Sequence, residues 1–241
     1  FVSIALLVAF EGVQMLDVFA ETFYAGLNSF VLLSIPMFIL MGMAVANSPA
    51  GKDLYTGLDR WLWRVPGGLV ISNIGACSIF AALSGSSPAT CAAIGTMGIP
   101  EMRKRGYSDE IATGTIAAGG TLGVLIPPSI VLIVYGLATG TSIGRLFLSG
   151  IIPGFMLASL FALWALFHSY FIDKTSSKAL RNKKPPTLKQ KLEVLPRIFP
   201  FLVIIIGVLY VLYGGVATPS EASGVGAFLV FVMIAVVYKI Y

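Results

Sequence analysis

Long uncharged, apolar runs separated by short charged segments dominate the chain. Such runs occupy positions 31–46, 65–100, 111–144, 146–172, 199–213 and 222–238. About 20 apolar residues are enough for a helix to cross the hydrocarbon core of a bilayer. The runs are continuous and do not show the alternation of roughly ten-residue barrel strands. The pattern therefore predicts an all-α polytopic membrane protein.

The uncharged block 65–100 has a length that fits neither one span nor two. As a single helix it would extend about 54 Å, against a hydrocarbon core of about 30 Å. Small polar residues, Ser84-Gly85-Ser86-Ser87, stand at its centre. We expect a re-entrant helical hairpin that enters the membrane, turns at 84–87 and leaves on the same side. Bare backbone at membrane depth is tolerated only where it is buried in protein or lines a wet cavity. The turn is therefore a candidate binding site.

The next apolar run is interrupted by two groups of helix-breaking residues. Gly119, Gly120 and Gly123 come first, and Pro127-Pro128 follow. We expect a discontinuous helix over 111–139, in which the glycines release the first half. The prolines are expected to start the second half, because proline suits the first turn of a helix. A simple proline kink is the alternative.

Several local signals predict where helices begin. Ser48-Pro49 is typical of an N-cap followed by the first helical residue, here of an amphipathic arm helix in the membrane plane. Ser87-Pro88 suggests the same for the second arm of the hairpin. Thr218 to Glu221 matches a capping box at the start of the last span, which favours a structural role for Glu221 over a functional one.

The distribution of basic residues supports the re-entrant interpretation. Cytoplasmic loops of membrane proteins are enriched in Lys and Arg. The polar loop 173–198 holds a large basic cluster and is taken as cytoplasmic. If 65–100 re-enters, all of the 16 Lys and Arg except Arg145 fall on that same side. A full crossing at 65–100 would break this agreement.

These elements give the expected organisation of the chain. Residues 1–64 would hold a scaffold span, an interfacial segment and the arm helix. Residues 65–145 would form part of a transport domain with the hairpin and the broken helix. The span 146–172, the loop 173–198 and the start of a second repeat at 199–241 would follow.

Composition narrows the functional classes. The chain is 57% hydrophobic and 11% charged, whereas soluble domains carry about 25% charged residues. The net charge of +5 follows from membrane topology, and no nucleic-acid partner is expected.

Cys77 and Cys91 suggest neither a disulfide framework nor a metal site. Phe1 opens within an apolar run, so no signal peptide is predicted. An intramembrane serine enzyme is not expected, because His168 has no acid to orient it.

The two interruptions have chemistry suited to a transport site. Helix C-terminal ends present free carbonyls, which suit a desolvated cation, and helix N-terminal ends present amides, which suit a carboxylate. Hydroxyls of Ser84, Ser86, Ser87 and Thr90 can add ligands. Secondary transporters bind substrate and ion at such discontinuous helices. A small-residue packing contact at 84–90 and a channel subunit with a re-entrant filter remain the alternatives.

Six motifs resemble the large membrane subunit of tripartite ATP-independent periplasmic (TRAP) transporters. They are IPMFILMG at 35–42, GACSIFAALSGSSPATCAAIG at 75–95, IPEMRKRGYS at 99–108, AAGGTLGVLIPPSIVLIVYG at 117–136, SIGRLFLSGIIPG at 142–154 and GGVATPSEAS at 214–223. The resemblance covers nearly the whole chain.

The resemblance implies a multi-pass protein of the bacterial inner membrane. It would import an organic acid, such as a C4-dicarboxylate or a sugar acid, by Na⁺ symport with an elevator mechanism. A periplasmic substrate-binding protein and a small membrane subunit would be its partners, and no organic cofactor is implied. Members of this family carry a second hairpin, which would lie beyond Tyr241. These 241 residues alone are therefore not expected to transport.

The resemblance also assigns candidate site residues. The Na⁺ site would comprise Ser84, Ser86, Gly123, Ile126 and Pro128. The residues expected to contact substrate are Ser86, Ser87, Pro88, Thr90, Thr121, Pro127 and Ser129.

Overall fold

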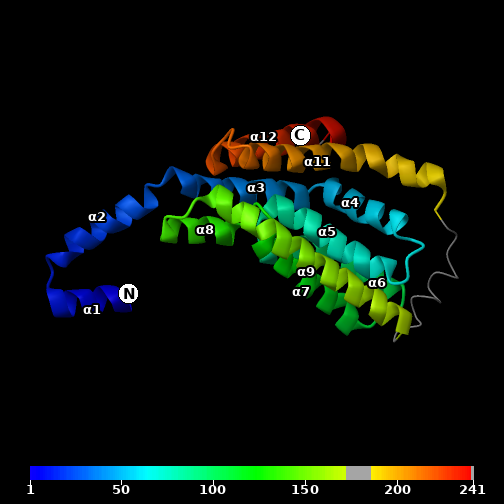
Figure 1. Cartoon of the computed structure of the whole chain (residues 1–241), viewed down its shortest axis with the longest axis horizontal. Coiled ribbons are helices and arrows are strands. Elements are labelled where there is room, and N and C mark those ends of the chain that lie inside the picture. The colour runs from blue at the N-terminus through cyan, green and yellow to red at the C-terminus, as the bar shows by residue number, and fades with distance from the viewer. Residues whose placement is uncertain (172–185, 240–241) are drawn as a thin grey trace.

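The computed structural model describes residues 1–171 and 186–239, and every regular element among them is helical (Figure 1). This confirms the all-α prediction. In chain order the elements are α1 (Val2–Glu11), α2 (Met15–Leu27), the 3-10 turn η1 (Phe30–Leu33), α3 (Ser34–Ala46), α4 (Pro49–Trp61), α5 (Gly68–Ser84), α6 (Ser87–Lys104), α7 (Asp109–Leu125), α8 (Ile130–Thr139), α9 (Ile143–Phe171), α11 (Leu188–Tyr213) and α12 (Pro219–Tyr238).

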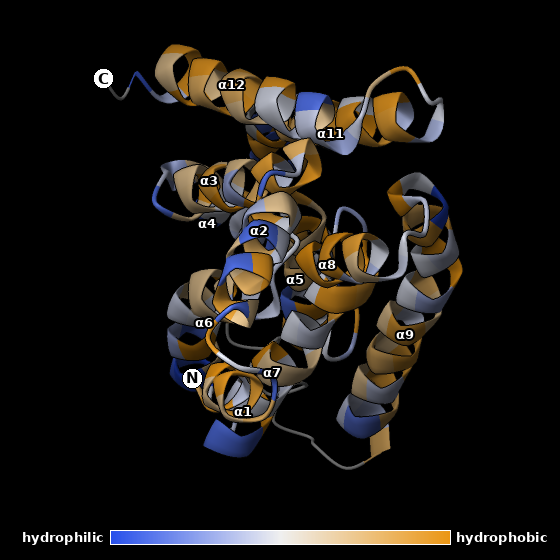
Figure 2. Cartoon of the chain, turned by 90° about the vertical axis from the view of Figure 1, so that its left-hand side faces the viewer, coloured by the Kyte–Doolittle hydropathy of each residue, from blue (hydrophilic) through white to orange (hydrophobic). Residues whose placement is uncertain are grey.

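The helices form two packed groups. One group contains α3, α4, α11 and α12, with α12 packed on α3 and α11 packed on α4. The other contains α5, α6 and α7, which pack against one another, with α9 crossing α5 and α7. Fully buried aromatic side chains, Phe38 on α3, Phe80 on α5 and Phe147 on α9, fill the core. Figure 2 shows apolar residues along most of α9 and α12, and several of them, such as Phe155 and Phe228, are exposed.

Several helices have the length and composition of membrane spans. Within the described residues, 3 helical segments qualify directly: Asp109–Thr139, Ile143–Phe171 and Pro219–Tyr238. Two bent pairs, Met15–Leu27 with Phe30–Ala46 and Leu188–Pro196 with Ile198–Tyr213, raise the number to 5 if each pair is one span. The chain is thus a multi-pass membrane protein, as its hydrophobic pattern predicts.

Two of the predicted helix starts are confirmed. The Ser48 hydroxyl accepts a hydrogen bond from the Ala50 amide at 3.3 Å, with Pro49 as the first residue of α4. At α12 the Glu221 amide donates to Thr218 Oγ1 at 3.3 Å, and the Thr218 amide donates to Glu221 Oε2 at 2.8 Å. Glu221 therefore completes a reciprocal capping box, which is the structural role favoured by the sequence.

Two predicted boundaries are wrong. The helix predicted from residue 146 begins earlier, at Ile143. The C-terminal part of the predicted loop 173–198 is helical, because Thr187 and Gln190 form a capping box that starts α11 at Leu188. Of the basic residues that suggested a loop, Lys189 and Lys191 lie on the first turn of that helix. Residues 172–185 of the predicted loop fall outside the described residues.

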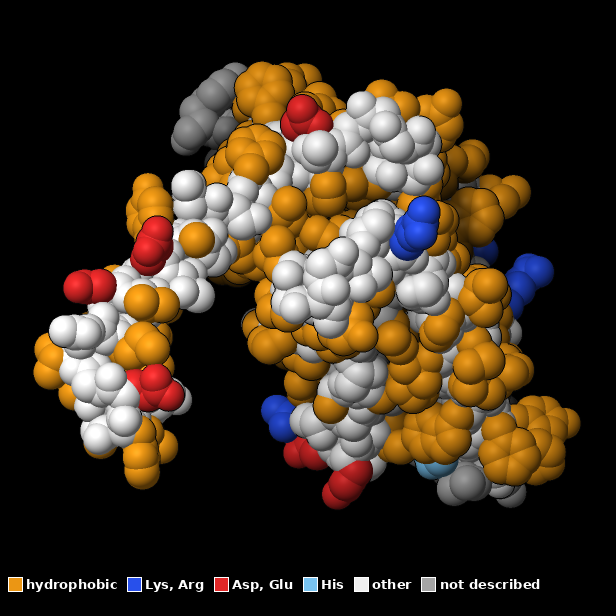
Figure 3. All heavy atoms as spheres, turned by 60° about the vertical axis from the view of Figure 1, so that its left-hand side comes forward, with side chains coloured by type: hydrophobic (Ala, Val, Ile, Leu, Met, Phe, Trp, Pro, Cys, Tyr) orange, Lys and Arg blue, Asp and Glu red, His pale blue; other side chains and the backbone are white. Residues whose placement is uncertain are grey.

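The N-terminal helices α1 and α2 extend away from the rest of the molecule (Figure 3). Neither helix has a buried residue. Their acidic residues are Glu11, Asp17 and Glu21, and acidic side chains are visible along this N-terminal extension in Figure 3. The interfacial segment predicted within residues 1–64 falls on α2, and its placement at a membrane interface stays a prediction.

Replacing Thr218 by Val tests the capping box. We expect this change to lower the free energy of unfolding by about 1 kcal/mol, because it removes the side-chain acceptor at the N-cap. Thr56→Val is the matched control, since the Thr56 hydroxyl donates only within its own helix, to the Lys52 carbonyl. Thermal melting in detergent measures both variants. Equal melting temperatures for the two would contradict a stabilising cap.

Candidate functional site

A tight turn joins the antiparallel helices α5 and α6 into a hairpin. Helix α5 ends at Ser84, and α6 begins at Ser87. Gly85 adopts a φ of 59°, a left-handed conformation suited to glycine, and its amide donates to the Ala81 carbonyl at 2.9 Å. Further down the arms, Asn73 Nδ2 donates to Met102 Sδ at 2.8 Å. A helical hairpin is present where the sequence predicts one over 65–100, and it continues through Pro100 to Lys104. Its re-entrant path through the membrane stays a prediction.

Hydroxyl groups tie the turn of this hairpin together. Ser84 Oγ lies 3.2 Å from Thr90 Oγ1, and both residues are fully buried. Thr90 Oγ1 donates to the Ser86 carbonyl at 2.8 Å, while the Ser86 amide donates to Ser84 Oγ at 3.4 Å. The hydroxyls of Ser84 and Thr90 therefore stabilise the backbone of the turn.

The N-cap of α6 lies one residue earlier than predicted. Ser86 has the extended backbone of an N-cap, and its hydroxyl accepts from the Ala89 amide at 3.5 Å. Ser87 is the first helical residue and Pro88 the second. The Ser87 hydroxyl is thereby released from capping, because the Ser86 side chain fills that role.

The break between α7 and α8 lies at the prolines and not at the glycines. Helix α7 is continuous through Gly119, Gly120 and Gly123 and ends at Leu125, and α8 begins only at Ile130. The expectation that the glycines release the first half is wrong. The expectation that the prolines begin the second half is also wrong, because Ser129 occupies the N-cap position of α8.

The glycines of α7 instead permit close packing against the hairpin. A Cβ at Gly119 would lie 2.9 Å from Cys77 Sγ, and one at Gly120 would overlap Cys91 Sγ. A Cβ at Gly123 would lie 2.8 Å from the Ser86 carbonyl carbon and 2.8 Å from the Ser87 nitrogen. Real Cβ atoms do not approach other atoms so closely, so each position requires glycine or a shift of its neighbours.

The turn of the hairpin meets the break directly. The Ile130 amide donates to the Gly85 carbonyl at 3.0 Å. A Cβ at Gly85 would lie 2.6 Å from the Pro128 carbonyl oxygen. Together with Gly123, the segments 84–87 and 126–129 form one contiguous cluster, which we call the junction. Four helix ends, those of α5, α6, α7 and α8, converge there.

Two hydroxyls at the junction are buried without a hydrogen-bond partner among the described residues. They are Ser87 Oγ and Ser129 Oγ, and the whole Ser129 residue is 0% exposed. Leaving a buried hydroxyl unpaired costs about 1–3 kcal/mol. Such groups are uncommon in native proteins, and each calls for an explanation. These two hydroxyls are available to bind a ligand.

The residues expected at the Na⁺ site gather in or beside the junction. Ser84 and Ser86 belong to the turn, and Gly123 touches it. Pro128 is buried in the break beside Gly85. Ile126 belongs to the same break, and its side chain lies against Gly154 of α9, where a Cβ would be 3.1 Å from Ile126 Cγ1.

Six of the seven residues expected to contact substrate lie in the junction or beside it. Ser86, Ser87, Pro127 and Ser129 lie in the junction, and Pro88 and Thr90 lie on the first turn of α6. Pro88 is exposed, whereas the Thr90 hydroxyl is bonded within the turn.

Thr121 lies apart from the junction. It is on an exposed face of α7, and its hydroxyl donates to the Ala118 carbonyl of its own helix at 2.6 Å. Helical periodicity turns Thr121 away from the face that carries Gly120 and Gly123, which pack against the hairpin. Its expected role in substrate binding gains no support from this placement.

Sequence reasoning missed one residue that positions the junction. A Cβ at Gly42 of α3 would lie 2.5 Å from Ser84 Cβ and 2.8 Å from Ser84 Cα. The only signal in the sequence was a glycine within an otherwise apolar helical run, which suggests a packing reason for its presence.

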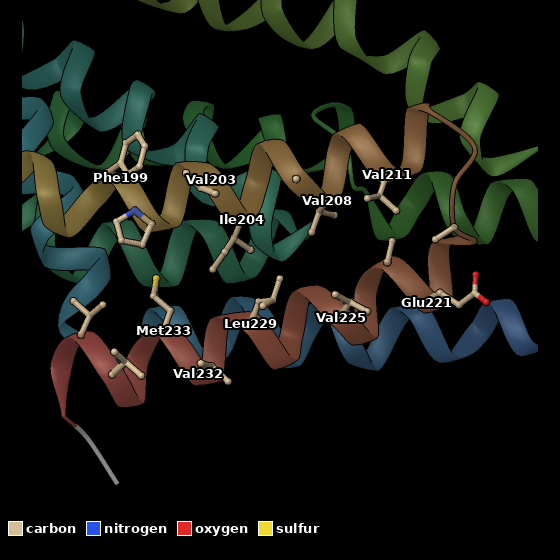
Figure 4. Close-up of a pocket in the computed structure, with 16 residues that line it drawn as sticks. Phe199, Val203, Ile204, Val208, Val211, Glu221, Val225, Leu229, Val232 and Met233 are labelled. Atoms are coloured by element: carbon tan, nitrogen blue, oxygen red, sulfur yellow. The ribbon is translucent and has the colours of Figure 1, made fainter.

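The surface also has a hollow that lacks the chemistry of a polar site. It is a groove of about 800 Å³ between α11 and α12 (Figure 4). Valine, leucine and isoleucine side chains line most of it, with Glu221 at one end. No set of convergent polar groups is available there to orient a solute, so the junction remains the candidate site.

Gly123→Ala tests the close contact between α7 and the hairpin. We expect it to lower the free energy of unfolding by about 1–3 kcal/mol, because the added methyl collides with backbone atoms of Ser86 and Ser87. Gly114→Ala is the matched control on the same helix, because nothing lies within 4 Å of its Cβ position. It should be neutral or stabilising by up to about 1 kcal/mol. Thermal melting in detergent that shows no difference between the variants would contradict the contact.

Comparisons with known proteins agree with the architecture. The family profile described as "Tripartite ATP-independent periplasmic transporter, DctM component" matches residues 1–241. The chain is 38% identical over 237 residues to the C4-dicarboxylate TRAP transporter large permease protein DctM of Vibrio cholerae, covering 98% of this chain and 51% of that protein.

Two further relatives have names that mention other solutes. The isethionate TRAP transporter permease protein DctMQ of Oleidesulfovibrio alaskensis is 36% identical over 226 residues, which are 94% of this chain and 35% of that protein. The ectoine TRAP transporter large permease protein TeaC of Halomonas elongata is 34% identical over 221 residues, or 91% of this chain and 50% of that protein. The chain thus spans about half, or less, of the length of these relatives. With the profile matching its whole length, the chain belongs to the DctM family of TRAP transporter large permeases.

Proposed function

We propose that the protein to which this chain belongs imports an organic acid by Na⁺ symport, with the junction as part of its binding site. The observation that carries this proposal is the pair of buried, unpartnered hydroxyls at Ser87 and Ser129, placed where two interrupted helices meet. A periplasmic substrate-binding protein would deliver the solute, and a small membrane subunit would accompany the large one in the inner membrane.

The helix ends at the junction supply the chemistry for both ligands. The last carbonyls of α5 and α7 lack partners within their helices and suit a desolvated cation. The first amides of α6 and α8 carry partial positive charge and suit a carboxylate. Some of these groups are already used, since the Ile130 amide donates to the Gly85 carbonyl and the Ala89 amide donates to the Ser86 hydroxyl. Hydroxyls of Ser87 and Ser129 complete the set of polar ligands.

The dimensions of the hairpin support a re-entrant path. Helix α5 has 17 residues, fewer than the roughly 20 needed to cross the hydrocarbon core. Its turn would therefore lie inside the membrane, where irregular backbone must be buried or line a cavity. Basic residues on both sides of the hairpin, in α4 and at 103–105, fit a return to the cytoplasmic side.

The two packed groups of helices suggest how the site moves. We take α3, α4, α11 and α12 as the scaffold and α5 to α8 as the first half of a mobile domain. In an elevator mechanism the mobile domain carries the bound ligands across the membrane against the scaffold.

The names of the relatives mention C4-dicarboxylates, isethionate and ectoine. Membership of the family therefore does not identify the solute that this protein transports.

Ser129→Ala in the complete transporter tests the proposed site. The assay is Na⁺-dependent uptake of a C4-dicarboxylate into proteoliposomes, with the small subunit and the binding protein present. A hydrogen bond to a charged ligand is worth about 1.5–3 kcal/mol, so we expect a roughly 10- to 100-fold weaker response to Na⁺ or to the carboxylate. The melting temperature without ligands should not fall, because the hydroxyl has no hydrogen-bond partner to lose among the described residues.

Ser72→Ala provides the matched control. Ser72 is also fully buried, but its hydroxyl donates to the Gly68 carbonyl of its own helix, away from the junction. Its uptake should keep the wild-type Na⁺ dependence. Uptake that needs no Na⁺, or a Ser129→Ala variant with unchanged responses to both ligands, would contradict the proposed site. Flux that only follows the solute gradient would favour a channel.

A further inference from the structure

A cluster of charged side chains joins the base of the hairpin to the arm helix α4. Arg105 follows the last turn of α6 and reaches across to Asp59 of α4. Its Nη1 donates to Asp59 Oδ1 at 2.9 Å, and its Nη2 donates to Asp59 Oδ2 at 2.6 Å. The same guanidinium also donates to Glu101 Oε1, from Nε at 3.0 Å and from Nη2 at 2.9 Å. Arg105 therefore bridges one carboxylate on α4 and one on α6.

This cluster is sheltered from solvent. The side chains of Arg105 and Asp59 are 13% and 16% exposed. By contrast, the neighbouring ion pair between Arg103 and Asp109 is 55% and 65% exposed. Sheltered two-point pairs of arginine with carboxylate are strong and directional, whereas exposed pairs contribute little. Burial acts to lower the pKa of Arg105, but the hydrogen bonds to Asp59 and Glu101 outweigh burial and raise it.

The other face of α4 is attached to the scaffold. Arg60 Nη1 donates to the Gln190 carbonyl of α11 at 2.7 Å. Near the other end of α4, the Tyr238 hydroxyl of α12 lies 3.1 Å from Asp53 Oδ2. Gly57 allows Val194 of α11 to approach, since a Cβ there would lie 3.1 Å from Val194 Cγ1. Arg105 thus connects the hairpin to a helix that is fixed to α11 and α12.

The contact at the opposite end of the hairpin has a different character. There, Gly42 of α3 allows close van der Waals approach to Ser84. Because glycine has no side chain, Gly42 forms neither a hydrogen bond nor an ion pair through a side chain with the hairpin. The scaffold therefore holds the hairpin by close packing at the tip and by charge at the base.

We propose that Arg105 and Asp59 form a latch, which holds the hairpin against α4 in the conformation described here and opens when the hairpin moves. This inference rests on the proposed transport function, because it assumes that the hairpin moves against the scaffold. Glu101 belongs to the same helix as the latch arginine and accepts from it at i,i+4. When Asp59 is released, Glu101 moves with Arg105 and keeps the guanidinium paired. This pairing lowers the free energy needed to separate Arg105 from Asp59.

Distance measurements between spin labels test the latch without relying on transport. The labels replace two exposed lysines, Lys52 on α4 and Lys104 on α6, in the complete large subunit in liposomes with its small subunit. Cys77 and Cys91 are changed to alanine in a background that retains its fold. We expect a dominant short distance, and Asp59→Asn should increase the ratio of the longer to the shorter population at least fivefold.

Matched variants separate the latch from a general loss of charge. Asp109→Asn removes a carboxylate from the exposed pair and should leave the distance distribution unchanged. Asp59→Glu keeps the charge and should retain most of the short population. If Asp59→Asn does not fold, Arg105→Lys replaces it, since lysine keeps the charge but cannot form the two-point contact.

The outcomes distinguish the latch from the transport proposal. A distribution that neither Asp59→Asn nor Arg105→Lys changes would overturn the latch, whatever the uptake assay shows. A population shift in a protein that shows no Na⁺-dependent uptake would support the latch as a conformational contact and count against symport. With both proposals correct, Asp59→Asn changes the rate of uptake while the Na⁺ dependence, which belongs to the junction, stays the same.

Discussion

The hydrogen bond from the Ile130 amide to the Gly85 carbonyl is the contact on which the arrangement of the site depends. It joins the start of α8 to the turn of the hairpin, two segments of irregular backbone in an apolar chain. Backbone groups that are buried away from water need hydrogen-bond partners, and this bond gives each interruption a partner in the other. Once the two segments meet, four helix ends are held within one cluster, and the polar groups of the junction follow.

Glycines make that meeting possible by removing side chains between the elements. Gly42, Gly120 and Gly123 bring α3 and α7 within contact of the hairpin, at distances that a Cβ would not permit. The same closeness buries the Ser87 and Ser129 hydroxyls without giving them partners. Packing that excludes water while leaving polar atoms unpaired lowers the stability of the ligand-free protein. The same unpaired atoms can form hydrogen bonds with a polar ligand.

The position of α4 links this site to the rest of the molecule. It follows α3 along the chain, packs against α11, and holds the base of the hairpin through Asp59 and Arg105. The tip of the hairpin rests on α3 and its base on α4, so one continuous stretch of chain supports both ends. Any movement of the hairpin must therefore change its contacts with this stretch.

The sequence by itself determined the helical class, the hairpin with its turn at 84–87, the break near Pro127-Pro128 and the caps at Ser48 and Thr218. These features depend on local signals: the length of an uncharged run, a capping residue or a proline. Only the tertiary structure decided that Gly123 is a contact point within a continuous helix, that Thr121 is exposed while Ser129 is buried, and that Arg105 reaches Asp59. Whether a glycine acts as a hinge or as a packing surface depends on the element beside it, and a pair 46 residues apart along the chain leaves no local pattern. Only the folded chain supplies those neighbours.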